Sequence, residues 1–170
     1  KKLNQKENKL ALCSAIAATK SKEIIESRGH KTKNISDFPM IVSDKIESVL
    51  KTSEMVKILH SLNLLQDIER LKSRKPRTGK SLLRGRGTKI GKSVLFVVSK
   101  AENLSKACKG IPGVDVQTTK NLSILDLAPG ADPIRLTVYS TTALKEIGEI
   151  KSPHLELMVS MNWKQKQQIR

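Results

Sequence analysis

The sequence predicts an α/β fold in which a mainly parallel sheet is covered by helices on both faces. Short strand-like apolar runs alternate with segments of helical spacing along the 170 residues. The strand-like runs are not joined by hairpin turn signals, so crossover connections are expected, and these favour parallel strands. An apolar content of 38% is enough for one domain with a modest core.

The N-terminal segment is predicted to form one long helix. It begins at about Gln5, behind a capping box formed by Asn4 and Glu7. It ends at Gly29, because glycine readily takes the left-handed conformation that terminates helices. Two lysines before an apolar stretch resemble the start of a secretory signal, but the helical spacing continues into charged residues, which favours the helix.

The remaining elements alternate between strand and helix. Residues 39–44 have the pattern of a short buried strand, and Thr52 is expected to cap the next helix. Ser99 and Glu102 form a second capping box, for a helix that Gly110 ends. The other strands are predicted over 94–98, 114–116 and 136–139, and a last helix over about 142–147.

Charge gives the first indication of function. The chain has 32 Lys and Arg against 16 Asp and Glu, a formal net charge of +16. Such an excess destabilises a compact state by self-repulsion unless an anion lies against it, and the usual anions are nucleic acid or an acidic membrane surface. A membrane partner is not expected, because surface binding requires a basic amphipathic helix and the most basic segment is too rich in glycine.

That basic segment lies between the second helix and the next strand. From Arg70 to Lys92 there are ten Lys or Arg and no acid, with Pro76 and four glycines among them. Gly and Pro at this density argue against a continuous helix, so we expect an extended basic arm inserted at 69–93. Arginine binds phosphate oxygens in pairs, which favours contact with a nucleic-acid backbone. The predicted contacts are Arg70, Lys72, Arg74, Lys75, Arg77, Lys80, Arg84, Arg86, Lys89 and Lys92.

The same segment contains two Gly-Lys-Ser triplets, so a nucleotide-binding α/β enzyme is the alternative. A P-loop would need glycine where Arg74 and Arg86 stand, which argues against this interpretation. A P-loop also opens a helix, whereas Ser93 is followed by a strand-like run. The alternative predicts saturable ATP or GTP binding that depends on Lys92.

No catalytic, metal or cofactor site is predicted from the remaining reactive residues. Cys13 and Cys108 are far apart and are expected to be buried, reduced thiols. The three histidines, His30, His60 and His154, have no partner at ligand spacing. These residues indicate neither a metal site nor a catalytic base with a partner, and no small-molecule substrate is expected.

The scarcity of aromatic residues indicates which nucleic acid is bound. Only Phe38, Phe96, Tyr139 and Trp163 are aromatic, so a stacking platform for single-stranded bases is not expected. No helix-turn-helix, zinc-finger or basic-zipper pattern is found either. Recognition through shape and backbone remains, and it suits a folded RNA.

Several motifs together resemble a known family. "NKLALCSAIAAT", "PMIVSDKIESVLKT", "LRGRGTK", "IPGVDV" and "DLAPGADPIRLTVYSTTALKEI" are similar, in this order, to the archaeal and eukaryotic branch of the universal large-subunit ribosomal protein four family. The resemblance covers about Lys1 to Ile147. It implies a Rossmann-like domain that binds large-subunit ribosomal RNA beside neighbouring ribosomal proteins in the cytoplasm, as a structural constituent without enzymatic activity.

The resemblance also implies a second RNA-binding patch. In that family a long loop directed toward the peptide exit tunnel precedes the segment similar to Lys1 to Thr19, and it would enter RNA beside Lys1. This loop is not in the sequence, so no tunnel-lining role is expected of these residues. The patch comprises Lys1, Lys2, Arg28, His30 and Lys31.

The sequence departs from the family pattern at Gly87-Thr88 and at Ile134, where altered local RNA contacts are expected. Residues 1–150 are expected to form the domain, and residues 151–170 a tail that resembles nothing known.

Overall fold

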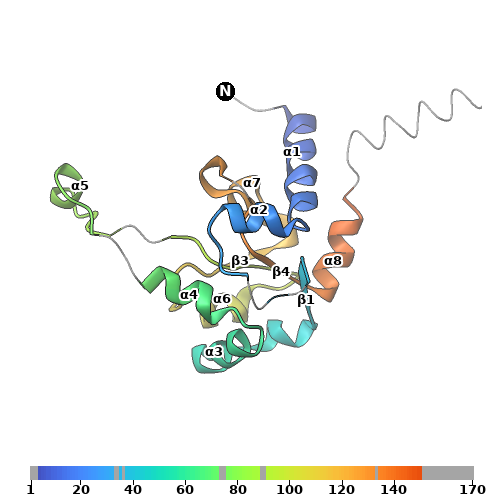
Figure 1. Cartoon of the computed structure of the whole chain (residues 1–170). Coiled ribbons are helices and arrows are strands. Elements are labelled where there is room, and N and C mark those ends of the chain that lie inside the picture. Colours follow the sequence, from blue (N-terminus) through green and yellow to red (C-terminus); the bar gives the residue numbers. More distant parts are fainter. Residues whose placement is uncertain are drawn as a thin grey trace, which may run out of the picture.

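A parallel sheet forms the centre of the fold in the computed structural model, which describes residues 4–32, 35, 37–72, 76–88, 91–132 and 134–150 (Figure 1). All strand pairings are parallel, and the strand order is β1-β4-β2-β3. The predicted α/β fold class is therefore confirmed. The strands are β1 (Met40–Val42), β2 (Leu95–Val98), β3 (Asp115–Thr118) and β4 (Thr137–Ser140).

The two central strands are buried on both faces. Every residue of β2 and β4 is buried, as expected for parallel strands covered from both sides. In the register, Phe96 lies between Val116 of β3 and Val138 of β4. Because side chains alternate along a strand, Phe96 joins one apolar cluster, whereas Leu95 joins the other.

Helices cover each of these clusters (Figure 1). The Leu95 side packs against α1 (Gln5–Ala18), α7 (Ile124–Leu127) and α8 (Thr141–Gly148). The Phe96 side packs against α3 (Thr52–Ser61), α4 (Leu65–Lys72) and α6 (Glu102–Cys108), and Ile25 of α2 (Lys22–Ser27) joins it. Short 3-10 helices span Asp44–Ser48, Thr119–Asn121 and Pro129–Ala131.

The N-terminal helix differs from the prediction. Asn4 caps it as expected, since its side chain accepts a hydrogen bond from the Lys6 N–H at 3.1 Å. The single helix predicted to reach Gly29 is wrong, because α1 ends at Ala18 and α2 is a separate element. The Thr19 hydroxyl donates to the Ile16 carbonyl at 2.6 Å, and this local bond competes with continuation of the helix.

Two predicted caps are also wrong. The N-cap of α3 is Lys51, and Thr52 is its first helical residue. Ser99 does not cap α6, because its hydroxyl donates to Glu146 of α8 at 2.6 Å. A contact between distant segments has overridden the local sequence pattern here.

The structure tests the predicted burial of the two thiols. Cys108 is buried, and burial raises the pKa of its thiol to about 12. Cys13 is only half-buried, so the predicted burial of both thiols is wrong for Cys13. Within the described ranges, no helix is long and apolar enough to cross a bilayer.

Candidate nucleic-acid interface

The middle of the basic segment, residues 76–88, forms a projecting hairpin that we call the arm hairpin (Figure 1). Pro76 and Thr88 form an antiparallel bridge, and the Arg77 N–H donates to the Gly87 carbonyl at 2.8 Å. The prediction of a fully extended segment is wrong at the tip, where α5 (Lys80–Leu83) makes one helical turn. The chain therefore presents a defined turn away from the sheet.

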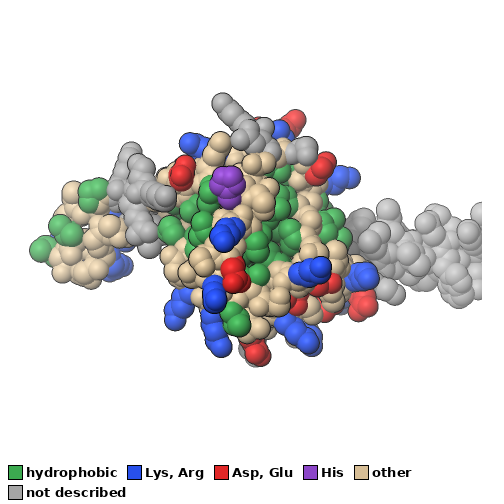
Figure 2. Space-filling view, turned by 90° about the horizontal axis from the view of Figure 1, so that it is seen from below, with side chains coloured by type: hydrophobic (Ala, Val, Ile, Leu, Met, Phe, Trp, Pro, Cys, Tyr) green, Lys and Arg blue, Asp and Glu red, His purple; other side chains and the backbone are tan. Residues whose placement is uncertain are grey.

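The basic side chains of the arm hairpin have no acidic partners. Lys80, Arg84 and Arg86 are exposed, and Arg77 is half-buried. None of the four has a carboxylate within ion-pair distance in the part of the chain that the structure describes. By contrast, Figure 2 shows Lys and Arg intermixed with Asp and Glu over the domain surface seen from below. The hairpin thus carries uncompensated positive charge.

Asp67 of α4 organises the place where the basic segment joins the domain, which we call the root. Its side chain is fully buried. One carboxylate oxygen accepts hydrogen bonds from the Lys31 N–H and from Arg70 Nε, both at 3.1 Å. The other accepts from the Ser93 hydroxyl at 2.5 Å and from His30 Nδ1 at 3.0 Å. Asp67 therefore ties residues His30 and Lys31, which follow α2, to both ends of the basic segment.

These hydrogen bonds also set the charge state of Asp67. Burial by itself raises the pKa of this carboxyl, but the hydrogen bonds from His30, Ser93 and Arg70 outweigh burial and hold the pKa well below its ordinary value. Asp67 is consequently ionised at neutral pH and can act as a permanent acceptor.

His30 was predicted to contact RNA, and the structure places it in the interior. Its side chain has no exposed surface. The Leu136 N–H donates to His30 Nε2 at 3.4 Å, which leaves Nδ1 as the nitrogen that donates to Asp67. His30 therefore supports the root from inside and offers no side-chain surface to RNA.

A second ion pair, between the buried Arg135 and the partly exposed Asp115, holds the root from the other side. Arg135 is 1% exposed and donates to the carbonyls of Ser93, Val94 and Gly113 at 2.8–3.0 Å. It also donates to Asp115 Oδ2 at 2.6 Å. Burial raises the pKa of Asp115, but Lys92 and Arg135 outweigh it and lower that pKa.

Lys92, one of the predicted RNA contacts, takes part in this pair. Its Nζ lies 2.8 Å from Asp115 Oδ2, while about half of its side chain stays exposed. Arg70 is likewise held by Asp67 and is 30% exposed. Both residues therefore serve the root while keeping part of their surface open.

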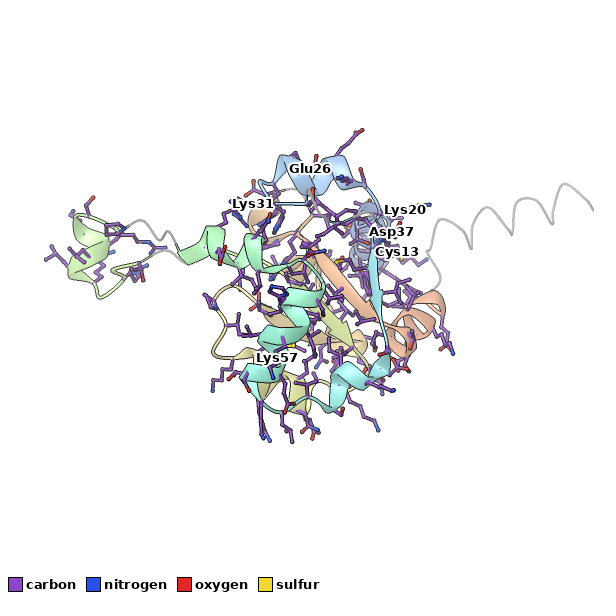
Figure 3. The ribbon with its side chains drawn as sticks, turned by 60° about the horizontal axis from the view of Figure 1, so that its bottom comes forward. Cys13, Lys20, Glu26, Lys31, Asp37 and Lys57 are labelled. Atoms are coloured by element: carbon purple, nitrogen blue, oxygen red, sulfur yellow. The ribbon has the colours of Figure 1, made fainter. Side chains whose placement is uncertain are left out.

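The structure brings part of the second predicted patch to the root. Arg28 is half-buried and donates to the Pro129 carbonyl at 2.8 Å. Burial lowers the pKa of Arg28, while the nearby Asp132 carboxylate raises it and the Arg70 guanidinium lowers it. The Lys31 side chain is exposed, and Figure 3 shows it on the side of the domain from which the arm hairpin projects.

Several predicted contacts lie outside the described residues. These are Lys1, Lys2, Arg74, Lys75 and Lys89, together with the side chain of Lys72.

At the edge of the sheet where nucleotides commonly bind, the chain's own carboxylates accept the hydrogen bonds of the backbone N–H groups. In open parallel α/β folds, ligands bind beyond the carboxyl ends of the strands, and phosphates bind at helix N-termini. Here Glu47 accepts from the N–H groups of Ser99 and Lys100, which follow β2, at 2.9 and 3.3 Å. Asp44 accepts from the Thr142 N–H at the start of α8, at 2.9 Å. A phosphate at this edge would have to displace these carboxylates.

Hydrogen bonding keeps this edge negative. Bonds from the Thr141 hydroxyl and from Thr142 lower the pKa of Asp44 to about 2. Glu146 accepts from the hydroxyls of Ser99 and Thr119, and its pKa is also lowered. A phosphate bound to the backbone N–H groups of this edge would therefore meet the negative charge of Asp44.

Neither Gly-Lys-Ser triplet has the geometry of a phosphate cradle. Gly79-Lys80-Ser81 opens the four-residue α5 at the tip of the arm hairpin. In the other triplet, Lys92 is paired with Asp115, and Ser93 is buried against Asp67. Among the described residues there is also no group of His, Cys, Asp or Glu suited to hold a metal ion.

Asp67 and Asp115 were not identified from the sequence. For Asp67 a signal exists, because Leu64, Asp67, Ile68 and Leu71 have the spacing of one buried helical face. A lone carboxylate on an apolar face indicates a buried partner. Asp115 has no comparable signal, since its partner Arg135 is 20 residues away and on another segment.

The fold and this interface define a basic, parallel α/β domain that carries a projecting cationic hairpin. Such a hairpin is the kind of element that contacts polyanions.

The chain belongs to the ribosomal protein L4/L1 family, whose model matches residues 1–150. Three of its relatives are named "Large ribosomal subunit protein uL4". The one from Haloquadratum walsbyi is 44% identical over 150 residues, the one from Methanococcus aeolicus 43% over 149, and the one from Archaeoglobus fulgidus 41% over 149. These matches cover 88%, 87% and 87% of this chain, which spans about three fifths (60%, 59% and 58%) of the relatives' length. The family resemblance found in the sequence is confirmed.

Proposed function

We propose that this chain is a structural constituent of the large ribosomal subunit that binds folded ribosomal RNA through backbone phosphates. The observation that carries the proposal is the arm hairpin, whose Arg77, Lys80, Arg84 and Arg86 have no acidic partner among the described residues. Membership of the ribosomal protein L4/L1 family supports the ribosomal setting. The proposal includes neighbouring large-subunit proteins as partners and assigns no enzymatic activity.

The physical basis is electrostatic. Each Lys or Arg that neutralises a phosphate releases condensed counterions, so the affinity comes largely from charge and falls steeply with salt. Arginine adds geometry, because its planar guanidinium binds two phosphate oxygens together. The exposed Lys31 side chain adds positive charge beside the root.

The root supports binding by fixing where the hairpin leaves the domain. Asp67 and Arg135 hold the two ends of the basic segment through buried hydrogen bonds. A positioned hairpin loses less conformational entropy on binding than a free loop would.

The test is the salt dependence of RNA binding by the double variant Arg84→Gln/Arg86→Gln. The probe is large-subunit ribosomal RNA transcribed from Methanococcus aeolicus, the organism of a 43% identical relative. We expect the slope of log affinity against log salt to flatten by about 0.7 to 0.9 per lost contact. The charge-matched control is Lys57→Gln/Lys106→Gln, which removes two exposed lysines on α3 and α6; Lys57 is labelled in Figure 3.

An unchanged slope for the arm variant, or an equal change for the control, would contradict the proposal. Saturable ATP binding that is lost in Lys92→Gln would instead favour the nucleotide-binding enzyme.

A further inference from the structure

The tip of the arm hairpin carries apolar side chains that phosphate binding does not use. Leu82 and Leu83 of α5 are 54% and 85% exposed. In the described part of the chain, Leu83 is the most exposed of the large apolar side chains. Figure 2 shows hydrophobic side chains on the projecting hairpin.

The two leucines differ in their surroundings. A Cβ atom placed on Gly87 would lie 3.5 Å from Leu82 Cδ1, so Leu82 leans back onto the neck of the hairpin. Leu83 is left in solvent at the outer side of the turn. Burying a leucine is worth roughly 1.5–3 kcal/mol, so a surface that covered Leu83 would gain affinity from the contact.

The positive charge of the arm hairpin indicates which kind of partner surface would cover Leu83. All charged residues in the arm hairpin are basic, and Lys80 and Arg84 stand three residues and one residue from Leu83. An apolar patch on a protein would need acidic residues all around it to match this tip. RNA offers phosphates together with flat apolar base faces, and apolar side chains are known to wedge against unstacked bases.

We propose that Leu83 packs against an unstacked base of the bound RNA while Lys80, Arg84 and Arg86 hold the flanking phosphates. This inference rests on the proposed RNA-binding function. It assigns the tip a preference for RNA with interrupted stacking, which the phosphate contacts alone cannot supply.

The test compares two RNA probes at one salt concentration. One is the Methanococcus aeolicus large-subunit transcript, and the other is a fully paired duplex RNA without loops or bulges. We expect Leu83→Ser to bind the transcript roughly tenfold more weakly, the loss that corresponds to one buried leucine. Binding to the duplex should stay unchanged. Leu83→Phe should bind the transcript at least as tightly as the unaltered chain, because a ring also covers a base face.

The control is Leu50→Ser, which removes a 57% exposed leucine from the segment between the 3-10 helix Asp44–Ser48 and α3. It should leave both affinities unchanged. Urea unfolding of each variant verifies that the domain is intact, and no change is expected for Leu83→Ser because its side chain makes no part of the core.

Three results would overturn the inference: an unchanged affinity of Leu83→Ser for the transcript, an equal loss on the duplex, or an equal loss for Leu50→Ser. An unchanged RNA affinity combined with poorer incorporation into large subunits would assign Leu83 to a protein partner instead. If the proposed RNA-binding function itself were wrong, Arg84→Gln/Arg86→Gln would bind both RNAs with the affinity of the unaltered chain. The two failures can therefore be distinguished.

Discussion

The root and the arm hairpin use the same basic residue types in opposite ways. At the root, Arg135 and Lys92 share Asp115, and Arg70 is bound to Asp67. In the hairpin, Arg84 and Arg86 are exposed and have no carboxylate partner within the described chain. Positive charge alone therefore does not locate an interface. What distinguishes the two regions is whether the protein has already satisfied the charge.

The largest expected effect is the loss of unfolding free energy when Asp67 is removed from the root. Asp67→Ala leaves the buried donors His30 and Ser93 without their acceptor, and each buried unsatisfied donor costs roughly 1–3 kcal/mol. Urea unfolding measures this loss. Glu69→Ala, an exposed carboxylate on the same helix, is the control and should change the unfolding free energy by less than about 0.5 kcal/mol. Similar losses for the two variants would contradict the central role of Asp67.

One glycine at the root, Gly113, and one in the arm hairpin, Gly85, allow the two regions to be compared through their backbone conformation. Gly113 and Gly85 both have positive φ, +76° and +73°, which disfavours any side chain. At Gly113 a Cβ would also lie 2.1 Å from Leu71 Cδ1 and 2.9 Å from the Gly91 carbonyl oxygen, whereas at Gly85 it would meet nothing within 4 Å. Gly113→Ala should therefore cost roughly 2–4 kcal/mol in unfolding free energy.

Gly85→Ala is expected to cost about 1 kcal/mol and only within the hairpin. Hydrogen exchange distinguishes the two effects, since only Gly113→Ala should speed exchange in β2. Equal exchange rates in β2 for both variants would show that a destabilised hairpin also destabilises the root, contrary to the comparison.

Acid should weaken the root and leave the hairpin unaffected. The pKa values of Asp67 and Asp115 are lowered in the folded state, so their stabilisation is present above the unfolded value of about 3.9 and is lost as pH falls through the folded values. The unfolding free energy should therefore decrease below about pH 4. Asp67→Ala should show a shallower decrease, and Arg84→Gln/Arg86→Gln the same decrease as the unaltered chain. A steeper acid dependence in Asp67→Ala would contradict this assignment.

The sequence predicted the fold class because the alternation of strand and helix patterns is a local signal. It also located the basic segment, since a run of one charge sign is visible without a structure. It did not predict the break between α1 and α2, which follows from a side-chain bond of Thr19. It likewise assigned Ser99 to a helix cap, although Glu146 binds that hydroxyl.

The candidate site was predictable only in part for a related reason. Exposed cations such as Lys80 and Arg84 can be found from composition, because their role requires no partner in the chain. Arg70 and Lys92 have the same composition signal, but their carboxylate partners stand 3 and 23 residues away. The pairing of Lys92 depends on a tertiary contact, which is not visible in a single sequence, whereas Arg70 and its partner lie one helical turn apart on α4.

The most direct test of the account is the salt dependence of RNA binding when all four described hairpin cations are neutralised. The variant Arg77→Gln/Lys80→Gln/Arg84→Gln/Arg86→Gln is compared with the unaltered chain on the Methanococcus aeolicus transcript. We predict that the slope of log affinity against log salt flattens by roughly three units, the sum for four phosphate contacts, while the unfolding free energy stays within about 0.5 kcal/mol. An unchanged slope with a folded protein would contradict the assignment of the arm hairpin as the RNA-binding element.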